Sequence, residues 1–205
     1  MANKMSEFYE YQWSTRTGGK ANFLGENRKM YDINEVADRG RALIALKELI
    51  GASVNFALKD KSCTQDDEFL YRFLFAKKFN VDDAFKLIIS YHDYKQRNCE
   101  ILQKMSALDE QIQMALRDGF PGVIQQRDRR GRKVIVFFTA NWNPALYSLV
   151  TIYRAMLLSL EKLLEEQQNQ ANGFVAVVDW TNFTMRQSTH LNPKILKLMI
   201  EGLQV

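Results

Sequence analysis

Apolar residues recur at helical spacing through the first half of the chain. Between Asn34 and Ile50 they return every three or four positions on one side of a predicted helix. A second helix is predicted from Thr64, because Thr64 and Asp67 have the spacing of a capping box ahead of an apolar stripe. Two more are predicted, from Asn80 to about Arg97 and from about Asp109 to Arg117. Short amphipathic helices cannot bury their apolar faces alone, so the pattern predicts a small helical bundle.

After Gly119 the period changes from that of helices to that of strands. A short strand is predicted from Val123 to Gln126, and an unbroken apolar strand from Lys133 to Thr139. Between them, Asp128 to Gly131 has the composition of a turn with glycine in its last position. The pattern therefore predicts a β-hairpin.

A long helix and a second apolar strand follow the hairpin. The helix is predicted from about Tyr147 to Gln168, and Asn172-Gly173 ends it before the strand Phe174 to Trp180. Strand, helix and strand in this order predict a parallel βαβ unit whose sheet is covered on both faces. A last helix is predicted from Pro193. The second apolar strand has the composition of a central strand but few candidate neighbours, so we expect an α/β domain that stops before its sheet is complete.

Composition and charge add a preference for anionic surfaces. The 205 residues carry 28 Lys and Arg against 24 Asp and Glu, a net charge of +4. No stretch reaches the roughly 18 apolar residues of a membrane span, and the N-terminus has no secretory signal. We therefore expect a soluble, cytosolic protein that touches membranes from outside. Residues 1–31 are polar and are predicted to form a flexible tail, on which Tyr9, Tyr11 and Trp13 could dock onto the body.

The motifs of common enzymes are missing from the sequence. The turn after the first apolar strand, Thr139 to Asn143, contains no glycine, and neither GK[ST] nor G-x-S-x-G occurs. Asp179 ends a predicted parallel strand, which is the one position where catalysis would be plausible; we expect it to cap the following turn instead. The chain is therefore predicted not to be an enzyme.

Cysteine and histidine usage argues against a disulfide or a metal site. Cys63 and Cys99 form no CxxC pair and are predicted to be reduced, buried thiols. His92 and His190 lie in unrelated patterns far apart in the sequence. No metal and no cofactor is predicted.

A basic run lies at the hairpin turn and allows two interpretations. It contains one acid and five bases, Arg127, Arg129, Arg130, Arg132 and Lys133. The run is either a solvated turn or a contact for anionic headgroups, where each base near a charged bilayer contributes about 1 kcal/mol. Nucleic acid is disfavoured, because no aromatic residues are interleaved with the bases.

Several of these segments together resemble a known family. They are DDEFLYRFL (66–74) with AKKF (76–79), the turn at 128–133 with its apolar strand, Arg154, NGFVAVVDWTNFT and LNPKILKLMIEGLQ. In combination they resemble the CRAL-TRIO lipid-binding family, in its retinaldehyde-binding and tocopherol-transfer branch. The resemblance covers roughly Asn34 to Gln204.

The resemblance implies a fold and a division of the chain. The fold is α/β: a small N-terminal helical bundle leaning on an incomplete CRAL-TRIO domain that contains a hairpin and a βαβ unit. After the tail, residues 32–108 would be the CRAL-TRIO N-terminal helical region and residues 109–205 a partial lipid-binding domain, truncated at its C-terminus. In the family a further strand, a gate helix and the headgroup-binding residues follow, at positions beyond Val205.

The resemblance also implies a lipid pocket. Its wall would include Tyr153, Met156, Leu160, Phe174, Val178 and Leu191. The spacing agrees in part, since residues 153, 156 and 160 share a helix face and residues 174 and 178 share a strand face. The other interpretation is that all six are ordinary core residues.

The function implied is binding or transfer of a hydrophobic lipid without chemistry. For the family members most similar in sequence, the implied function extends to recognition of phosphatidylinositol 3,5-bisphosphate at endosomal, trans-Golgi or clathrin-derived membranes. The expected partners are the lipid, a phosphoinositide membrane surface and clathrin-trafficking proteins. The alternative is a truncated form that binds a protein partner and no lipid.

Overall fold

The computed structural model describes residues 33–204, with side chains from residue 38 onward. The segment from Ala37 to Val205 forms one compact unit, to which the following description refers. The predicted tail at 1–31, with Tyr9, Tyr11 and Trp13, lies outside the described residues.

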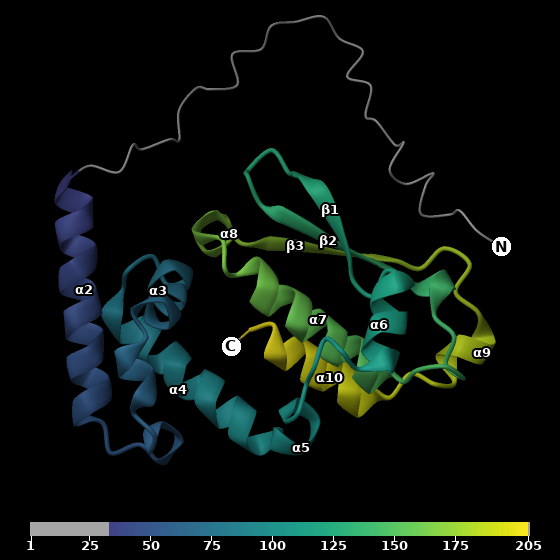
Figure 1. Cartoon of the computed structure of the whole chain (residues 1–205), viewed down its shortest axis with the longest axis horizontal. Coiled ribbons are helices and arrows are strands. Elements are labelled where there is room, and N and C mark those ends of the chain that lie inside the picture. The colour runs from purple at the N-terminus through teal and green to yellow at the C-terminus, as the bar shows by residue number, and fades with distance from the viewer. Residues whose placement is uncertain (1–32, 205) are drawn as a thin grey trace, which may run out of the picture. The chain divides into compact units, whose positions relative to one another are not determined.

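Three helices form the N-terminal part of this unit (Figure 1). They are α2 (Ile33–Ala52), α3 (Asp67–Ala76) and α4 (Val81–Arg97), with the 3-10 turns η1 (Phe56–Leu58) and η2 (Ser62–Gln65) between α2 and α3. Their apolar faces meet in one core, whose most deeply buried members are Leu46, Ile50, Leu58, Leu70, Leu74, Ala84 and Ile88. The predicted helical bundle is therefore confirmed for the described residues.

The caps of these helices confirm one prediction and correct another. Asn80 caps α4, because its side-chain oxygen accepts the backbone N–H of Asp83 at 3.1 Å. The capping box predicted at Thr64 is wrong. Thr64 lies in η2, where its hydroxyl donates to a backbone carbonyl, and the carboxylate of Asp66 caps α3 by accepting the N–H of Phe69 at 2.9 Å. Helix α3 therefore begins at Asp67 and its cap lies two residues later than predicted, because the 3-10 turn η2 occupies the positions before it.

A three-stranded sheet follows two short helices, α5 (Cys99–Leu102) and α6 (Glu110–Arg117). Strand β1 (Gly122–Arg127) pairs antiparallel with β2 (Lys133–Phe138), and β2 pairs parallel with β3 (Phe174–Asp179). The strand order is β1-β2-β3, so the hairpin and the parallel βαβ unit are both confirmed.

The connection between the parallel strands is two helices rather than the single long one predicted. They are α7 (Leu149–Leu163) and α8 (Gln167–Asn172). At the break, Asn169 donates its side-chain amide to the Leu163 carbonyl at 2.6 Å, and Gln170 does the same to Leu164 at 2.7 Å. These amides satisfy carbonyls that a continuous helix would pair with its own backbone, so the chain can turn here.

Two further helices, α9 (Met185–Ser188) and α10 (Pro193–Gly202), follow β3. Pro193 begins α10 as predicted. Helix α7 lies along one face of the sheet, and α10 packs against α7 (Figure 1). Ile135 and Phe137 of β2 belong to the same core as the inner face of α7.

Strand β3 departs from the expectation of a strand covered on both faces. It lies at the edge of the sheet, and Val177 and Val178 are 43% and 44% exposed. Among the described residues these side chains are therefore covered only in part. The unbroken apolar run was a sound reason to predict a strand, but it does not reveal which of its residues are buried.

Candidate functional site

Helix α7 is the element from which the candidate lipid site is built. Its first turn is capped by Ser148, whose hydroxyl accepts the N–H of Thr151 at 3.3 Å. One side of the helix faces β2, and apolar residues at spacings of three and four bury that side. Its deeply buried side chains are Leu149, Ile152, Tyr153, Ala155 and Met156.

The structure brings five of the six predicted pocket residues to a single core. Tyr153 and Met156 are buried members of this core, while Leu160, Phe174 and Leu191 are half-buried and pack against it. The sixth, Val178, is on the same face of the sheet as Phe137 of β2, with which it is paired in register, but it is 44% exposed. Their assignment to a lipid pocket stays a prediction.

The hydroxyl of Tyr153 has a partner inside the protein. It forms a short hydrogen bond with the hydroxyl of Tyr94 from α4, and Tyr94 donates to the Leu198 carbonyl of α10 at 2.9 Å. Burial raises the pKa of Tyr153 far above its ordinary value, and the bond to Tyr94 raises it further. Burial also raises the pKa of Tyr94. Both phenols are therefore neutral, and the pair fastens α4, α7 and α10 together.

Gly202 at the end of α10 is what lets the helix approach this pair. A Cβ at that position would overlap the Tyr153 hydroxyl and lie 2.8 Å from the hydroxyl oxygen of Tyr94. Only a residue without a side chain fits here without displacing the tyrosines.

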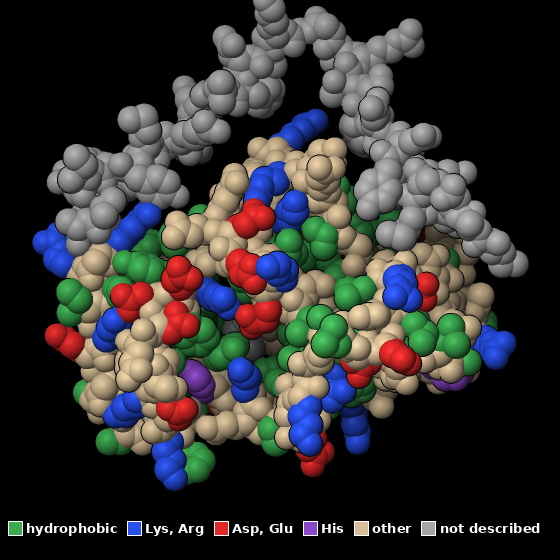
Figure 2. Space-filling view, viewed as in Figure 1, with side chains coloured by type: hydrophobic (Ala, Val, Ile, Leu, Met, Phe, Trp, Pro, Cys, Tyr) green, Lys and Arg blue, Asp and Glu red, His purple; other side chains and the backbone are tan. Residues whose placement is uncertain are grey.

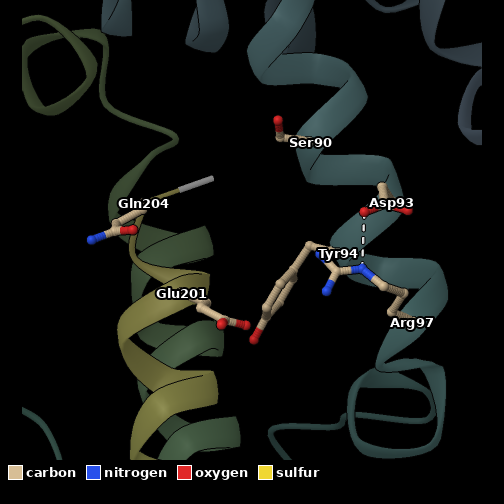
Figure 3. A pocket seen from close by; sticks show the side chains of 6 residues that line it. All are labelled: Ser90, Asp93, Tyr94, Arg97, Glu201 and Gln204. Atoms are coloured by element: carbon tan, nitrogen blue, oxygen red, sulfur yellow. Dashed lines mark hydrogen bonds and ion pairs between the residues drawn. The ribbon is translucent and has the colours of Figure 1, made fainter.

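A cavity of about 250 Å³ opens beside the tyrosine pair (Figure 3). Its lining is mainly polar and comprises Ser90, Asp93, Tyr94, Arg97, Glu201 and Gln204. Figure 3 shows Tyr94 reaching from α4 toward α10, with its hydroxyl beside the Glu201 carboxylate, while Arg97 pairs with Asp93 at 2.9 Å. A lining of this kind suits water rather than an alkyl chain.

A second cavity, of about 120 Å³, lies between α3 and the α7–α8 break. Its lining includes Arg72 and Gln170, and Arg72 also pairs with Glu161 at 2.8 Å. The Nε atom of Arg72 and the Oε1 atom of Gln170 are buried without a partner among the described residues. Neither cavity is lined by any of the six predicted pocket residues.

Three of the five bases at the hairpin turn are engaged within the protein. Arg127 donates to Asn169 at 2.6 Å and to Glu166 at 2.7 Å. Arg132 pairs with Asp128 at 2.6 Å. The Nζ atom of Lys133 donates to a backbone carbonyl of β1 at 3.0 Å. These three side chains hold the hairpin and α8 in place.

The other two bases, Arg129 and Arg130, project from the turn. Both are exposed, and no partner of their guanidinium groups is found within residues 33–204. Figure 2 shows basic side chains gathered at the end of the hairpin. The turn below them is rigid, because the Asp128 carboxylate accepts the backbone N–H groups of Arg130 and Arg132 at 2.9 and 2.8 Å. Of the predicted headgroup contacts, these two are the ones whose side chains have no partner among the described residues.

The structure gives Asp179 the structural role predicted for it. Its carboxylate accepts the backbone N–H of Thr181 at 2.9 Å, and hydrogen bonds from Thr181 hold the pKa of Asp179 below its ordinary value. Cys63 and Cys99 are free thiols. Cys63 is half-buried, but Cys99 is exposed, so the prediction of a buried thiol at Cys99 is wrong. Cys99 begins the four-residue helix α5, with Asn98 between it and the end of α4, and this short helix does not bury it.

Two buried polar residues that organise the site were missed from the sequence. Gln187 of α9 donates to the carbonyls of Thr139 and Trp142 at 2.9 and 2.7 Å. Asn169 is completely buried and accepts the Arg127 guanidinium. A signal for α9 was present, because Thr184 and Gln187 form a capping box with the expected spacing.

Comparison with known proteins places the chain in a family. The sequence profile of the CRAL/TRIO domain matches residues 117–205, and that of the CRAL/TRIO N-terminal domain matches residues 45–90. The chain belongs to the CRAL/TRIO family. The fold agrees, since a helical N-terminal region precedes a domain with a mixed sheet and covering helices.

Within the family the chain is similar to the clavesins. It is 50% identical to clavesin-1 of Xenopus laevis over 139 residues, which are 68% of this chain and 42% of that protein. It is 48% identical to clavesin-2 of Homo sapiens over the same shares of the two chains. The match therefore spans about two fifths of the length of these relatives. Among the described residues, no helix is both long and apolar enough to cross a membrane.

Proposed function

We propose that this chain binds a hydrophobic lipid without chemical conversion and carries it at membrane surfaces in vesicle traffic. Family membership supports the class of ligand. The observation that carries the proposal is the sheet face beside α7. There Phe137 is 8% exposed, whereas its register partner Val178 is 44% exposed. An apolar surface therefore continues from the core to the outside, and an alkyl chain covering it would bury area worth about 25 cal/mol per Å².

Leu160 provides a test of the pocket. It packs half-buried at the edge of the core, so Leu160→Asp would place an unpaired charge on the apolar wall. We expect the variant to lose uptake of a fluorescent long-chain lipid, measured by emission change on mixing with donor vesicles. Leu146→Asp is the matched control, since Leu146 is 52% exposed in the loop before α7 and is not one of the six residues. Unchanged uptake by Leu160→Asp would argue against the pocket.

The finer proposal is recognition of phosphatidylinositol 3,5-bisphosphate on endosomal or trans-Golgi membranes, with clathrin-trafficking proteins as partners. The exposed pair Arg129 and Arg130 supports an anionic surface, although two arginines alone do not select one phosphoinositide. Replacing both with Gln should weaken binding to vesicles that contain this lipid. Arg127→Gln is a poor control, because Arg127 holds α8. Lys194→Gln on α10, another exposed base, is a better one.

The alternative function is a protein-interaction module without lipid binding. The close packing of Tyr153 and Met156 and the polar lining of both cavities favour it. A vesicle pull-down with this chain, combined with the uptake assay, separates the two functions. Uptake of lipid would exclude the alternative, and its complete absence would exclude the carrier.

A further inference from the structure

The loop between α2 and η1 exposes two apolar side chains. Val54 is 101% exposed and Phe56 is 75% exposed. Single exposed apolar residues are common on protein surfaces, so exposure alone does not indicate a binding site. Here, however, the two side chains lie two positions apart on one short loop, and the loop itself has a fixed structure.

Hydrogen bonds and a buried anchor hold the loop. The Ser53 hydroxyl accepts the N–H of Asn55 at 3.1 Å, and the Asn55 side chain accepts the N–H of Ala57 at 2.8 Å. Ala57 and Leu58 then turn inward and are 9% and 0% exposed, and Leu58 belongs to the same core as α2 and α4. Because these bonds and the buried Ala57 and Leu58 fix the backbone of the loop, Val54 and Phe56 are presented outward, and less ordering of the loop is needed on binding.

Two lysines follow the apolar side chains in the same stretch, at Lys59 and Lys61. The Lys59 ammonium lies 5.8 Å from the centroid of the Phe56 ring, so charge and ring are close together. Lys61 donates to the Gly51 carbonyl and is fixed beside the loop. The one acid in this stretch, Asp60, is occupied in accepting the N–H of Ser62 at 2.9 Å. The loop therefore combines an apolar tip with a cationic base.

We propose that Val54 and Phe56 insert into the interfacial region of an anionic membrane while Lys59 and Lys61 contact lipid phosphates. The aromatic ring suits the boundary between headgroups and acyl chains. A lysine stem can lie along apolar surface while its ammonium remains among the headgroups, and the Lys59 ammonium is close enough to the Phe56 ring for this arrangement. The inference rests on the proposed function only in that both need a membrane. It adds a docking site on the helical region, separate from α7 and from the hairpin turn.

Co-sedimentation with vesicles tests the docking site. The probe is a vesicle of phosphatidylcholine with about one fifth phosphatidylserine, a surface that attracts nearby bases. Val54→Ser with Phe56→Ser should weaken partitioning about tenfold, the loss expected when two inserted side chains are removed. The matched control is Leu108→Ser with Met185→Ser, which replaces two side chains that are each 83% exposed elsewhere. That control should change binding less than twofold, well below the loop effect.

Fluorescence locates the loop directly. Phe56→Trp should show emission that shifts to shorter wavelength on vesicle binding and is quenched by brominated acyl chains, in excess of the signal from the native tryptophans. Equal binding by the loop variant and wild type, absence of binding by wild type, or no quenching at position 56 would each overturn the docking site.

The two proposals fail in different assays. Loss of vesicle binding in the loop variant with lipid uptake absent in wild type would leave docking intact and refute the lipid carrier. Lipid uptake that is present in wild type and lost in Leu160→Asp would support the lipid carrier. If the loop substitutions leave vesicle binding unchanged in the same experiments, the docking site is refuted.

Discussion

Replacing Gly202 with alanine should destabilise the fold through the tyrosine pair. The added methyl group would overlap the Tyr153 hydroxyl and lie 3.2 Å from its Cζ atom. Tyr153 is 0% exposed and does not line the cavity beside the pair, so its ring cannot move into solvent to make room. The clash must therefore be relieved by shifting α10 or by breaking the hydrogen bond between the two tyrosine hydroxyls.

The magnitude follows from these two routes. Overpacking a well-filled core costs about 1–3 kcal/mol, and a lost buried hydrogen bond about 1 kcal/mol. Alanine returns up to about 1 kcal/mol of helix propensity, and less at the last residue of a helix. We expect a net loss of about 1–3 kcal/mol in the free energy of unfolding. For a chain of this length that lowers Tm by roughly 2–12 °C.

Urea unfolding followed by circular dichroism measures the change, and a double-mutant cycle identifies its cause. Tyr153→Phe removes the atom that the new methyl group overlaps, so Gly202→Ala should cost at least about 1 kcal/mol less in that background. Gly40→Ala is the control, because a Cβ at Gly40 meets nothing within 4 Å and should stabilise α2 by about 0.5–1 kcal/mol. A Gly202→Ala protein as stable as wild type, or costs that add without coupling, would refute the account.

Three further predictions concern the elements around the site. Gln187→Ala should lower the free energy of unfolding by about 1–3 kcal/mol in urea titrations, because two buried carbonyls lose their donor; a neutral effect would contradict this. Arg127→Gln should cost about 1–2 kcal/mol, whereas Arg129→Gln should stay within about 0.5 kcal/mol, and equal costs would show that the turn is misassigned. The hydrogen bond from Arg132 lowers the pKa of Asp128, so the stabilising effect of that carboxylate is full at neutral pH and is lost as pH falls through the lowered pKa. Asp128→Asn should therefore lower the urea midpoint near neutral pH, and the difference from wild type should shrink as the solution is acidified toward about pH 3. A gap that does not change with pH would exclude this ion pair as its source.

The order and type of the main elements could be predicted from the sequence because they depend on local periodicity. The hairpin, the parallel strand, the cap at Asn80 and the helix start at Pro193 all follow from residues close together in the chain. The break between α7 and α8 could not be predicted from local periodicity. It depends on the side-chain amides of Asn169 and Gln170 folding back onto α7, and nothing in the apolar spacing shows that.

The candidate site was predicted less completely, because its determinants are distant in sequence. Five bases at the turn look alike until Glu166 and Asn169, about forty residues away, bind one of them. Tyr153 has the spacing of a pocket residue, yet its hydroxyl is bound by Tyr94, fifty-nine positions earlier. Periodicity identifies which face of a helix is apolar, but not what that face contacts.

Helix α4 belongs to both cores of the described unit. Ile88 is packed among the helices of the N-terminal region, and Tyr94, about 9 Å further along the axis, is packed against α7 and α10. A helix of this length is stiff, so its two halves must turn together. A tilt of the N-terminal helices, such as one caused by binding another molecule, would therefore also move Tyr94 and the parts of α7 and α10 that Tyr94 contacts. The helical region therefore cannot swing as an independent appendage while α4 remains intact.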